Sequence, residues 1–286
     1  MNKQPIGLCI GNVFKLPLAE ALPQIKDIGF DAVSPVWNKD PSVLERTVQQ
    51  ARALGFTIQS LHAPHRGAGD LWSRDCTVST PSLQQLLQSV EDCAALAIPI
   101  LVVHTWNGFD FSAGHIPTGL NNFSVLVEAA HRHGVQIAFE NLQGESYLYA
   151  LMEHFHDAEH VGFCWDSGHQ LCYAPHTPFL RDFGNRLVMT HLNSNPGISD
   201  PNGIITARDD VHYLPFDGAI CWDTLMPQLC AARPQEILNF EFKQISKDYQ
   251  PQNETYMQQS FTEYLSEAYK QARTLADRYA DGRRAL

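Results

Sequence analysis

Short apolar runs recur along the chain, and a polar loop and a segment of helical spacing follow each of them. The runs predict strands at residues 6–10, 32–37, 57–62, 98–104, 135–140, 161–166, 187–192 and 237–242. Strands that alternate with helices pair in parallel through right-handed crossovers. Eight strand–helix units within about 250 residues predict a (β/α)8 barrel.

The segments between these strands carry the helical pattern. Apolar positions recur at helical spacing within residues 41–54, 81–96 and 120–133. Pro41 and Pro81 each suit the first turn of a helix, where a missing N–H costs nothing. Residues 260–279 predict a final amphipathic helix, and residues 281–286, DGRRAL, predict a loose tail.

The main alternative to a barrel is a doubly wound open sheet. That fold usually carries a phosphate-binding loop, and neither GxGxxG nor GxxxxGK[ST] follows a predicted strand. No internal repeat or low-complexity linker divides the chain, so we expect one barrel domain over residues 1–286. The polar segment 193–214 predicts a long loop over the mouth of the barrel.

Composition narrows the class of protein. The net charge of −11 weighs against a broad nucleic-acid or membrane surface, although it leaves room for a local basic groove. The seven cysteines are scattered without a CxxC pair, which is typical of small core residues in a reducing compartment. No signal-peptide pattern or run of 18 apolar residues is present, so we expect a cytoplasmic protein.

Ionisable side chains end six successive predicted strands. In chain order they are His62, His104, Glu140, Asp166, His191 and Glu241. An apolar strand that ends in a charge carries a burial cost unless the charge is paired or bound to a metal. Because the carboxyl ends of barrel strands meet at one mouth, these side chains are expected to share a pocket. Mixed carboxylate and imidazole ligands suit a divalent ion such as Mn²⁺, Zn²⁺, Mg²⁺ or Co²⁺.

Three further residues become candidate ligands only because the strand-end residues are expected to lie beside them. His169 follows Asp166 across a Ser167–Gly168 pair, which we interpret as a turn that aims the imidazole at the same pocket. Asp210 and His212 form a D-x-H pair in the long loop, and alone they would be read as a solvated surface. Beside the strand-end ligands they become candidates for additional metal or substrate contacts.

The motifs FEN, CWDSGH, THLN, DDVHYLPFDGAICWDTL and FEFK resemble those of the xylose-isomerase-like TIM barrels over residues 62–243. This superfamily contains sugar (phosphate) isomerases and epimerases and the endonuclease IV class of DNA-repair enzymes. Resemblance to the epimerase branch implies one metal ion, held by Glu140, Asp166, His191 and Glu241. Resemblance to the endonuclease branch implies three ions, whose further ligands match His62, His104, His169, Asp210 and His212.

The resemblance therefore implies a divalent-metal-dependent sugar or sugar-phosphate isomerase or epimerase. In such an enzyme the metal chelates the oxygens of an open-chain ketose. Glu140 and Glu241 then act as the acid/base pair that moves the proton through a metal-bound cis-enediolate. The alternatives are a multi-metal phosphodiester hydrolase of the endonuclease IV kind and a metal-dependent dehydratase. The loop after His62, APHRGAGDLW, lacks a close match to the endonuclease loop, which disfavours a DNA substrate.

Three residues are candidates for substrate binding. Lys243 lies two positions beyond Glu241, on the same side of an extended strand, and can hold a phosphate or carboxylate. Arg66 is a weaker candidate for the same role, and Trp106 is a candidate to pack on a sugar face. The sequence leaves open which sugar binds, whether one to three ions are held, and whether the chain forms a homo-oligomer.

Overall fold

A computed structural model of the chain describes residues 3–11, 14–112, 114–245 and 254–286. The strands fall where the apolar runs predict them, except that the third is broken at Gln59 and Ser60. Their bounds are β1 Ile6–Ile10, β2 Ala32–Pro35, β3 Thr57–Ile58, β4 Leu61–His62, β5 Ile100–His104, β6 Gln136–Glu140, β7 Val161–Asp166, β8 Leu187–His191 and β9 Leu238–Phe240.

The strands form a closed parallel barrel. One sheet has the order β3-β2-β1-β9 and the other the order β4-β5-β6-β7-β8, and neighbouring strands are parallel. Isolated parallel bridges join the two sheets at both seams, from Val36 to His62 and from Leu192 to Phe240. The predicted (β/α)8 barrel is therefore confirmed, with strand-end residues at its seams.

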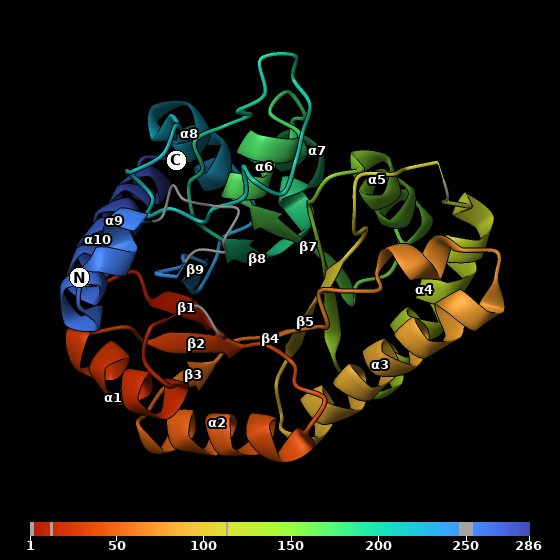
Figure 1. Ribbon diagram of the computed structural model, residues 1–286, viewed down its shortest axis with the longest axis horizontal. Helices are drawn as coiled ribbons and strands as arrows, with labels where there is room; N and C mark the ends of the chain where they lie inside the picture. Colours follow the sequence, from red (N-terminus) through yellow and green to blue (C-terminus); the bar gives the residue numbers. More distant parts are fainter. Residues whose placement is uncertain (1–2, 12–13, 113, 246–253) are drawn as a thin grey trace.

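Helices form an outer ring around the strands (Figure 1). The ring closes where α10 packs against both α1 and α8. The helices are α1 Leu18–Ile28, α2 Pro41–Ala53, α3 Cys76–Ala95, α4 Ile116–Arg132, α5 Glu145–His154, α6 Ser167–Tyr173, α7 Phe179–Phe183, α8 Trp222–Ala231, α9 Glu254–Gln258 and α10 Phe261–Arg284, with short 3-10 helices at η1 Gly69–Trp72 and η2 Gly184–Arg186.

A helix cap and a contact between helices explain why two predicted helix ends were wrong. Asp75 caps α3 by accepting a hydrogen bond from the Thr77 backbone N–H, so the helix starts before Pro81, which lies inside it. The predicted loose tail is also mostly helical, because α10 continues to Arg284. The Arg283 guanidinium donates to the carbonyls of Cys230 and Ala232 and fixes that end of the helix to α8.

The core has two parts, as the period-2 pattern of barrel strands requires. The outer faces of the strands and the helices share one large apolar cluster. A smaller cluster of inward side chains fills the barrel between β5 and β8: Val102, Ala138, Cys164 and Met189. The interior is a packed core, so the site must lie at an end of the barrel.

The polar segment after β8 contains no helix or strand between residues 193 and 221. It is nevertheless ordered, because Ser194 and Tyr213 form an antiparallel bridge across it. Among the described residues, no helix has the length and apolar character needed to cross a bilayer.

Candidate metal centre

The alternation of strand side chains delivers the candidate ligands to one place. Two residues beyond each inward side chain of the small cluster, and therefore on the same face, lie the strand-end residues His104, Glu140, Asp166 and His191. Register pairs His104 with Glu140 and Asp166 with His191 on neighbouring strands. The predicted ligands form the layer directly above the packed interior, at the carboxyl ends of the strands.

Four of the predicted ligands converge. One ligand atom from each of Glu140, Asp166, His191 and Glu241 lies within 4.8 Å of the others, and all four residues are buried. His191 Nδ1 lies 3.0 Å from Glu140 Oε1 and 2.8 Å from Glu241 Oε2. Among the described residues, Oε2 of each glutamate has no hydrogen-bond partner of good geometry. Buried, unsatisfied carboxylate oxygens around one point fit a divalent cation.

The buried carboxylates of this group repel one another. Burial raises the pKa of Asp166 to about 6, and the nearby Glu140 carboxylate adds to the rise. Burial also opposes the ionisation of Glu140, but His191 and the nearby imidazoles of His104 and His169 hold the pKa of Glu140 well below its ordinary value. Three carboxylates and one imidazole thus crowd a largely buried site, where a dication would offset the repulsion.

A second group of ligands lies beside the first. Ligand atoms of His169, Asp210 and His212 lie within 4.8 Å of one another. Asp210 Oδ1 is 3.5 Å from His169 Nε2 and 3.1 Å from His212 Nε2. His212 Nδ1 lies 2.9 Å from the Glu241 carbonyl, so donation there leaves a lone pair on Nε2, the atom that faces Asp210, for an ion.

Asn195 holds this second group in place. Its Oδ1 accepts hydrogen bonds from the backbone N–H groups of Val211, at 2.7 Å, and His212, at 2.9 Å. His212 has φ of 52°, in the left-handed region that non-glycine residues seldom adopt. The buried amide of Asn195 stabilises that conformation and brings a loop residue to the strand ends, which the D-x-H spacing alone does not specify.

His62 and His104 approach the first group from its other side. Their Nε2 atoms lie 3.3 Å and 3.4 Å from Glu140 Oε2. His62 Nδ1 is 2.8 Å from the Ala63 carbonyl, which fixes the tautomer with a lone pair on Nε2. Glu140 is therefore shared between the four-residue group and this histidine pair.

Two residues near the metal centre were not predicted as candidate ligands. His65 lies with its ring centroid 4.2 Å from that of His62 and joins His62 and His104 in a third group of possible ligands. Its signal was the H-x-x-H spacing in HAPH. Cys9 lies within 4.8 Å of His191 and Glu241, and burial raises the pKa of its thiol to about 11. Only the fold brings Cys9 here, because strand β1 lies far away in sequence.

The predicted turn at Ser167–Gly168 is wrong, because α6 begins directly at Ser167. Asp166 is the N-cap of this helix, and its Oδ1 accepts the backbone N–H of His169 at 2.6 Å. A Cβ on Gly168 would lie 1.8 Å from Asn193 Oδ1, so glycine is required there for space. The motif places a ligand and a helix start at one residue, and the helix carries His169 back toward the mouth.

A cavity of about 660 Å³ lies over the candidate metal centre. Lys243 and Arg66, two of the residues predicted to contact the substrate, line this cavity. The described lining does not include Trp106, which is buried against Tyr147 with ring centroids 4.1 Å apart and planes 5° apart. Trp106 is thus a packing residue, because its ring face is already covered.

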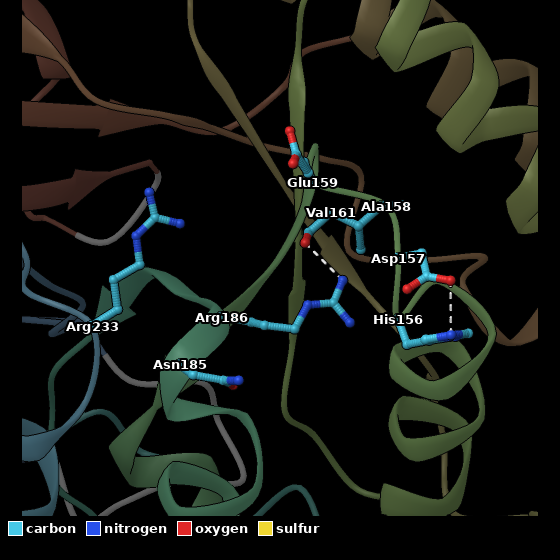
Figure 2. Close-up of a pocket in the computed structure, with 8 residues that line it drawn as sticks. All are labelled: His156, Asp157, Ala158, Glu159, Val161, Asn185, Arg186 and Arg233. Carbon is cyan, nitrogen blue, oxygen red and sulfur yellow. Dashed lines mark hydrogen bonds and ion pairs between the residues drawn. The ribbon is translucent and has the colours of Figure 1, made fainter.

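A second cavity, of about 500 Å³, lies where β7 begins (Figure 2). Arg186 donates there to the carbonyls of Met152, Phe155 and Val161, which joins the end of α5 to the start of β7. His156 and Asp157 pair with each other at its edge. These contacts indicate a stabilising role at the end of the barrel away from the ligands.

One curated relative and many solved structures resemble this chain. The uncharacterized protein y4fM of Sinorhizobium fredii is 30% identical over 182 residues, which cover 59% of this chain and 54% of that protein. The chain thus spans about half the length of this relative. A D-tagatose 3-epimerase-like protein has 17% identity and a TM-score of 0.66, with 93% of this chain and 98% of that chain covered.

The structure of an IOLI protein with a bound zinc atom has 17% identity and a TM-score of 0.70. That match covers 96% of this chain and 98% of the other. At such identities the likeness shows the fold alone. Residues 22–263 match the family described as xylose isomerase-like TIM barrels, so the sequence resemblance is confirmed and the chain belongs to that family.

Proposed function

We propose that the protein is a divalent-metal-dependent isomerase or epimerase of sugars or sugar phosphates. The observation that carries this proposal is the buried convergence of Glu140, Asp166, His191 and Glu241 at the mouth of the barrel. Membership of the family supports an enzyme of this class. The D-tagatose 3-epimerase-like neighbour agrees with an epimerase, and the zinc atom bound in the IOLI structure agrees with a metal-binding protein of this fold.

A divalent ion at this group would polarise a carbonyl and acidify the neighbouring C–H bond of an α-hydroxy ketone. Glu140 and Glu241 supply the proton transfers. One carboxylate removes the proton from carbon, and the other returns a proton to the opposite face or to the neighbouring carbon. His191 Nδ1 lies within 3.0 Å of an oxygen of each glutamate, so both carboxylates border the same space.

The remaining residues of the mouth bind and orient the substrate in this proposal. Lys243 and Arg66 line the cavity as cations, and an anionic group on the substrate would approach them. His169 sits between Asp166 and Asp210, at the border between the four-residue group and the second group. Asp166 holds the backbone of His169 in position through the N-cap hydrogen bond.

Proton exchange tests the proposal directly. Wild-type protein incubated with candidate ketoses in D₂O should introduce deuterium at the carbon next to the carbonyl, measured by NMR. Glu140→Gln and Glu241→Gln should each slow this exchange by about 10²- to 10⁴-fold, because each removes a proton-transfer group.

The matched control is Glu145→Gln, a glutamate exposed in the first turn of α5. It should exchange at the wild-type rate. Bound metal is measured in every variant, since Glu140 is also a proposed ligand. A Glu140→Gln protein that keeps its metal and exchanges as fast as wild type contradicts the two-glutamate mechanism.

A second candidate function is supported by the other ligand groups. His169, Asp210 and His212 converge, and His62 and His104 share Glu140, so the mouth holds donors for more than one ion. Such a centre can hydrolyse a phosphodiester. Duplex DNA with one abasic site is the test substrate, and a nicked product favours this function over sugar isomerisation. No nicking at full metal loading rejects it.

A further inference from the structure

The cavity over the metal centre is larger than a single sugar unit. Its volume is about 660 Å³. At about 30 Å³ for each water molecule of the liquid, this space corresponds to roughly twenty waters. A hexose has about twelve non-hydrogen atoms, well below the roughly twenty waters that fit in this space, whereas pockets of this size enclose drug-sized ligands. A second group on the ligand is therefore needed to fill the remaining volume.

That remaining volume has an apolar wall. Above β1 and β2 the cavity is bordered mainly by apolar side chains: Ile10, Leu18, Val36, Trp37, Val43 and Leu44. Asn38 and Thr47 are polar residues in the same part of the lining. The same cavity continues to Glu241 and Lys243 at the metal centre. We call this part of the cavity, lined from the ends of β1 and β2 and the starts of α1 and α2, the apolar arm. A second sugar ring would lose the hydrogen bonds of most of its hydroxyls there, so an apolar group is the better occupant.

Trp37 is the rigid element of the apolar arm. Its backbone N–H donates to the His62 carbonyl at 2.8 Å, which ties it to a strand that carries a predicted ligand. Its indole Nε1–H donates to Asp92 Oδ2 at 2.7 Å, on helix α3. Both donors are thus engaged within the protein, and what the side chain offers an occupant is apolar surface. An aromatic ring fixed in advance binds at a low cost in conformational entropy.

We propose that the substrate is a keto sugar that carries an apolar, preferably aromatic, aglycone. The sugar unit lies at the metal centre and the aglycone lies against Trp37 in the apolar arm. Because a glycosidic bond keeps the sugar ring closed, the carbonyl belongs on a ring carbon rather than at the anomeric position. The proton leaves and returns at the carbon beside that carbonyl, and the glycosidic bond stays intact. This assignment rests on the proposed isomerase or epimerase function.

The test compares phenyl 3-keto-β-D-glucoside with free 3-keto-D-glucose. Deuterium uptake in D₂O gives kcat/KM for each sugar. Wild type should prefer the phenyl glycoside by roughly 10- to 100-fold, the effect expected from burying one aromatic group. Trp37→Ala should remove most of this preference, Trp37→Phe should keep much of it, and Asp92→Ala should weaken it by freeing the indole. Trp106→Phe, outside the cavity, should leave the ratio unchanged.

Calorimetric binding of unoxidised phenyl β-D-glucoside and of glucose separates this inference from the proposed function, because it needs no turnover. If wild type binds the phenyl glycoside more tightly than glucose and Trp37→Ala removes that difference, the result supports the apolar arm. This holds even if neither keto sugar exchanges its proton. The lack of exchange would then count against the proposed function alone. The inference is overturned if wild type binds the two sugars with equal affinity. It is also overturned if Trp37→Ala protein, with a wild-type unfolding temperature, loses the same affinity for both sugars.

Discussion

Three of the candidate ligands, Asp166, His62 and His212, are oriented by contacts outside the ligand groups, and this feature distinguishes the site from a chance cluster of charges. Asp166 accepts hydrogen bonds from His169 and Asn193, while His62 and His212 each reach a backbone carbonyl through Nδ1. Such outer contacts fix the tautomer of a histidine and the direction of a carboxylate. The residue types were visible in the sequence, but their partners depend on the fold.

Asn193 provides a test of this orientation. Its Nδ2 donates to Asp166 Oδ2 at 2.9 Å. Asn193→Ala should lower the affinity for the first metal ion by about 10- to 100-fold, because Asp166 loses the contact that directs it. Calorimetric titration of metal into chelator-treated protein measures this. Asn185→Ala, an exposed residue at the opposite end of the barrel, is the control and should bind metal like wild type.

Gly168 tests the close packing behind the same ligand. A methyl group at this position would overlap the side chains of Asn193 and Asn195. Gly168→Ala should lower the free energy of unfolding by about 1–3 kcal/mol through overpacking, and it should weaken metal binding because both asparagines shift. Urea denaturation with and without metal measures both effects. Unchanged stability and affinity would contradict the described packing.

Elements were predicted well where the pattern is local and repeated. Strands β1 and β7 have the predicted bounds, because short, fully buried apolar runs leave little freedom. The start of α3 was missed because the Asp75 cap outweighs the proline signal at Pro81. The break between β3 and β4 was also missed, since it depends on neighbouring strands. Local chemistry sets the elements, whereas contacts across the barrel set their exact ends.

Helix α10 gives a test at this scale. Ser260 and Glu263 form a capping box at its start, and the helix closes the outer ring between α1 and α8. Ser260→Ala should destabilise the protein by about 1 kcal/mol, seen as a fall of about 2–4 °C in the unfolding temperature. Ser266→Ala, whose hydroxyl bonds only its own helix at Thr262, should have little effect.

At the scale of the whole molecule, the sequence predicted a barrel that gathers its ligands at one mouth, and both the family membership and the structure confirm that barrel. It could not specify that Glu140 is shared by two ligand groups, or that His65 and Cys9 lie beside them. Trp106 was misplaced because a strand-end aromatic looks the same in sequence whether it faces the cavity or Tyr147. The domain limits, oligomeric state, cellular location and nucleic-acid binding stay predictions.

Metal should stabilise the folded protein, because only the barrel brings the ligands together. At a free ion concentration about 100 times Kd, binding adds about 2.7 kcal/mol to the free energy of unfolding. Removal of metal by a chelator should therefore lower the unfolding temperature by about 5–10 °C, measured by scanning calorimetry. Asp166→Asn should remove most of this difference between chelated and metal-loaded protein.

The central claim is that Glu140, Asp166, His191 and Glu241 bind one divalent ion for proton transfer on a sugar. Calorimetric titration of chelator-treated protein with Mn²⁺, Zn²⁺, Mg²⁺ and Co²⁺ tests it most directly. The account predicts about one tightly bound equivalent for at least one of these ions, lost in Asp166→Asn and in His191→Ala. Two or three tight equivalents would favour the hydrolase, and the absence of saturable binding, or binding unchanged in both variants, would contradict the metal centre itself.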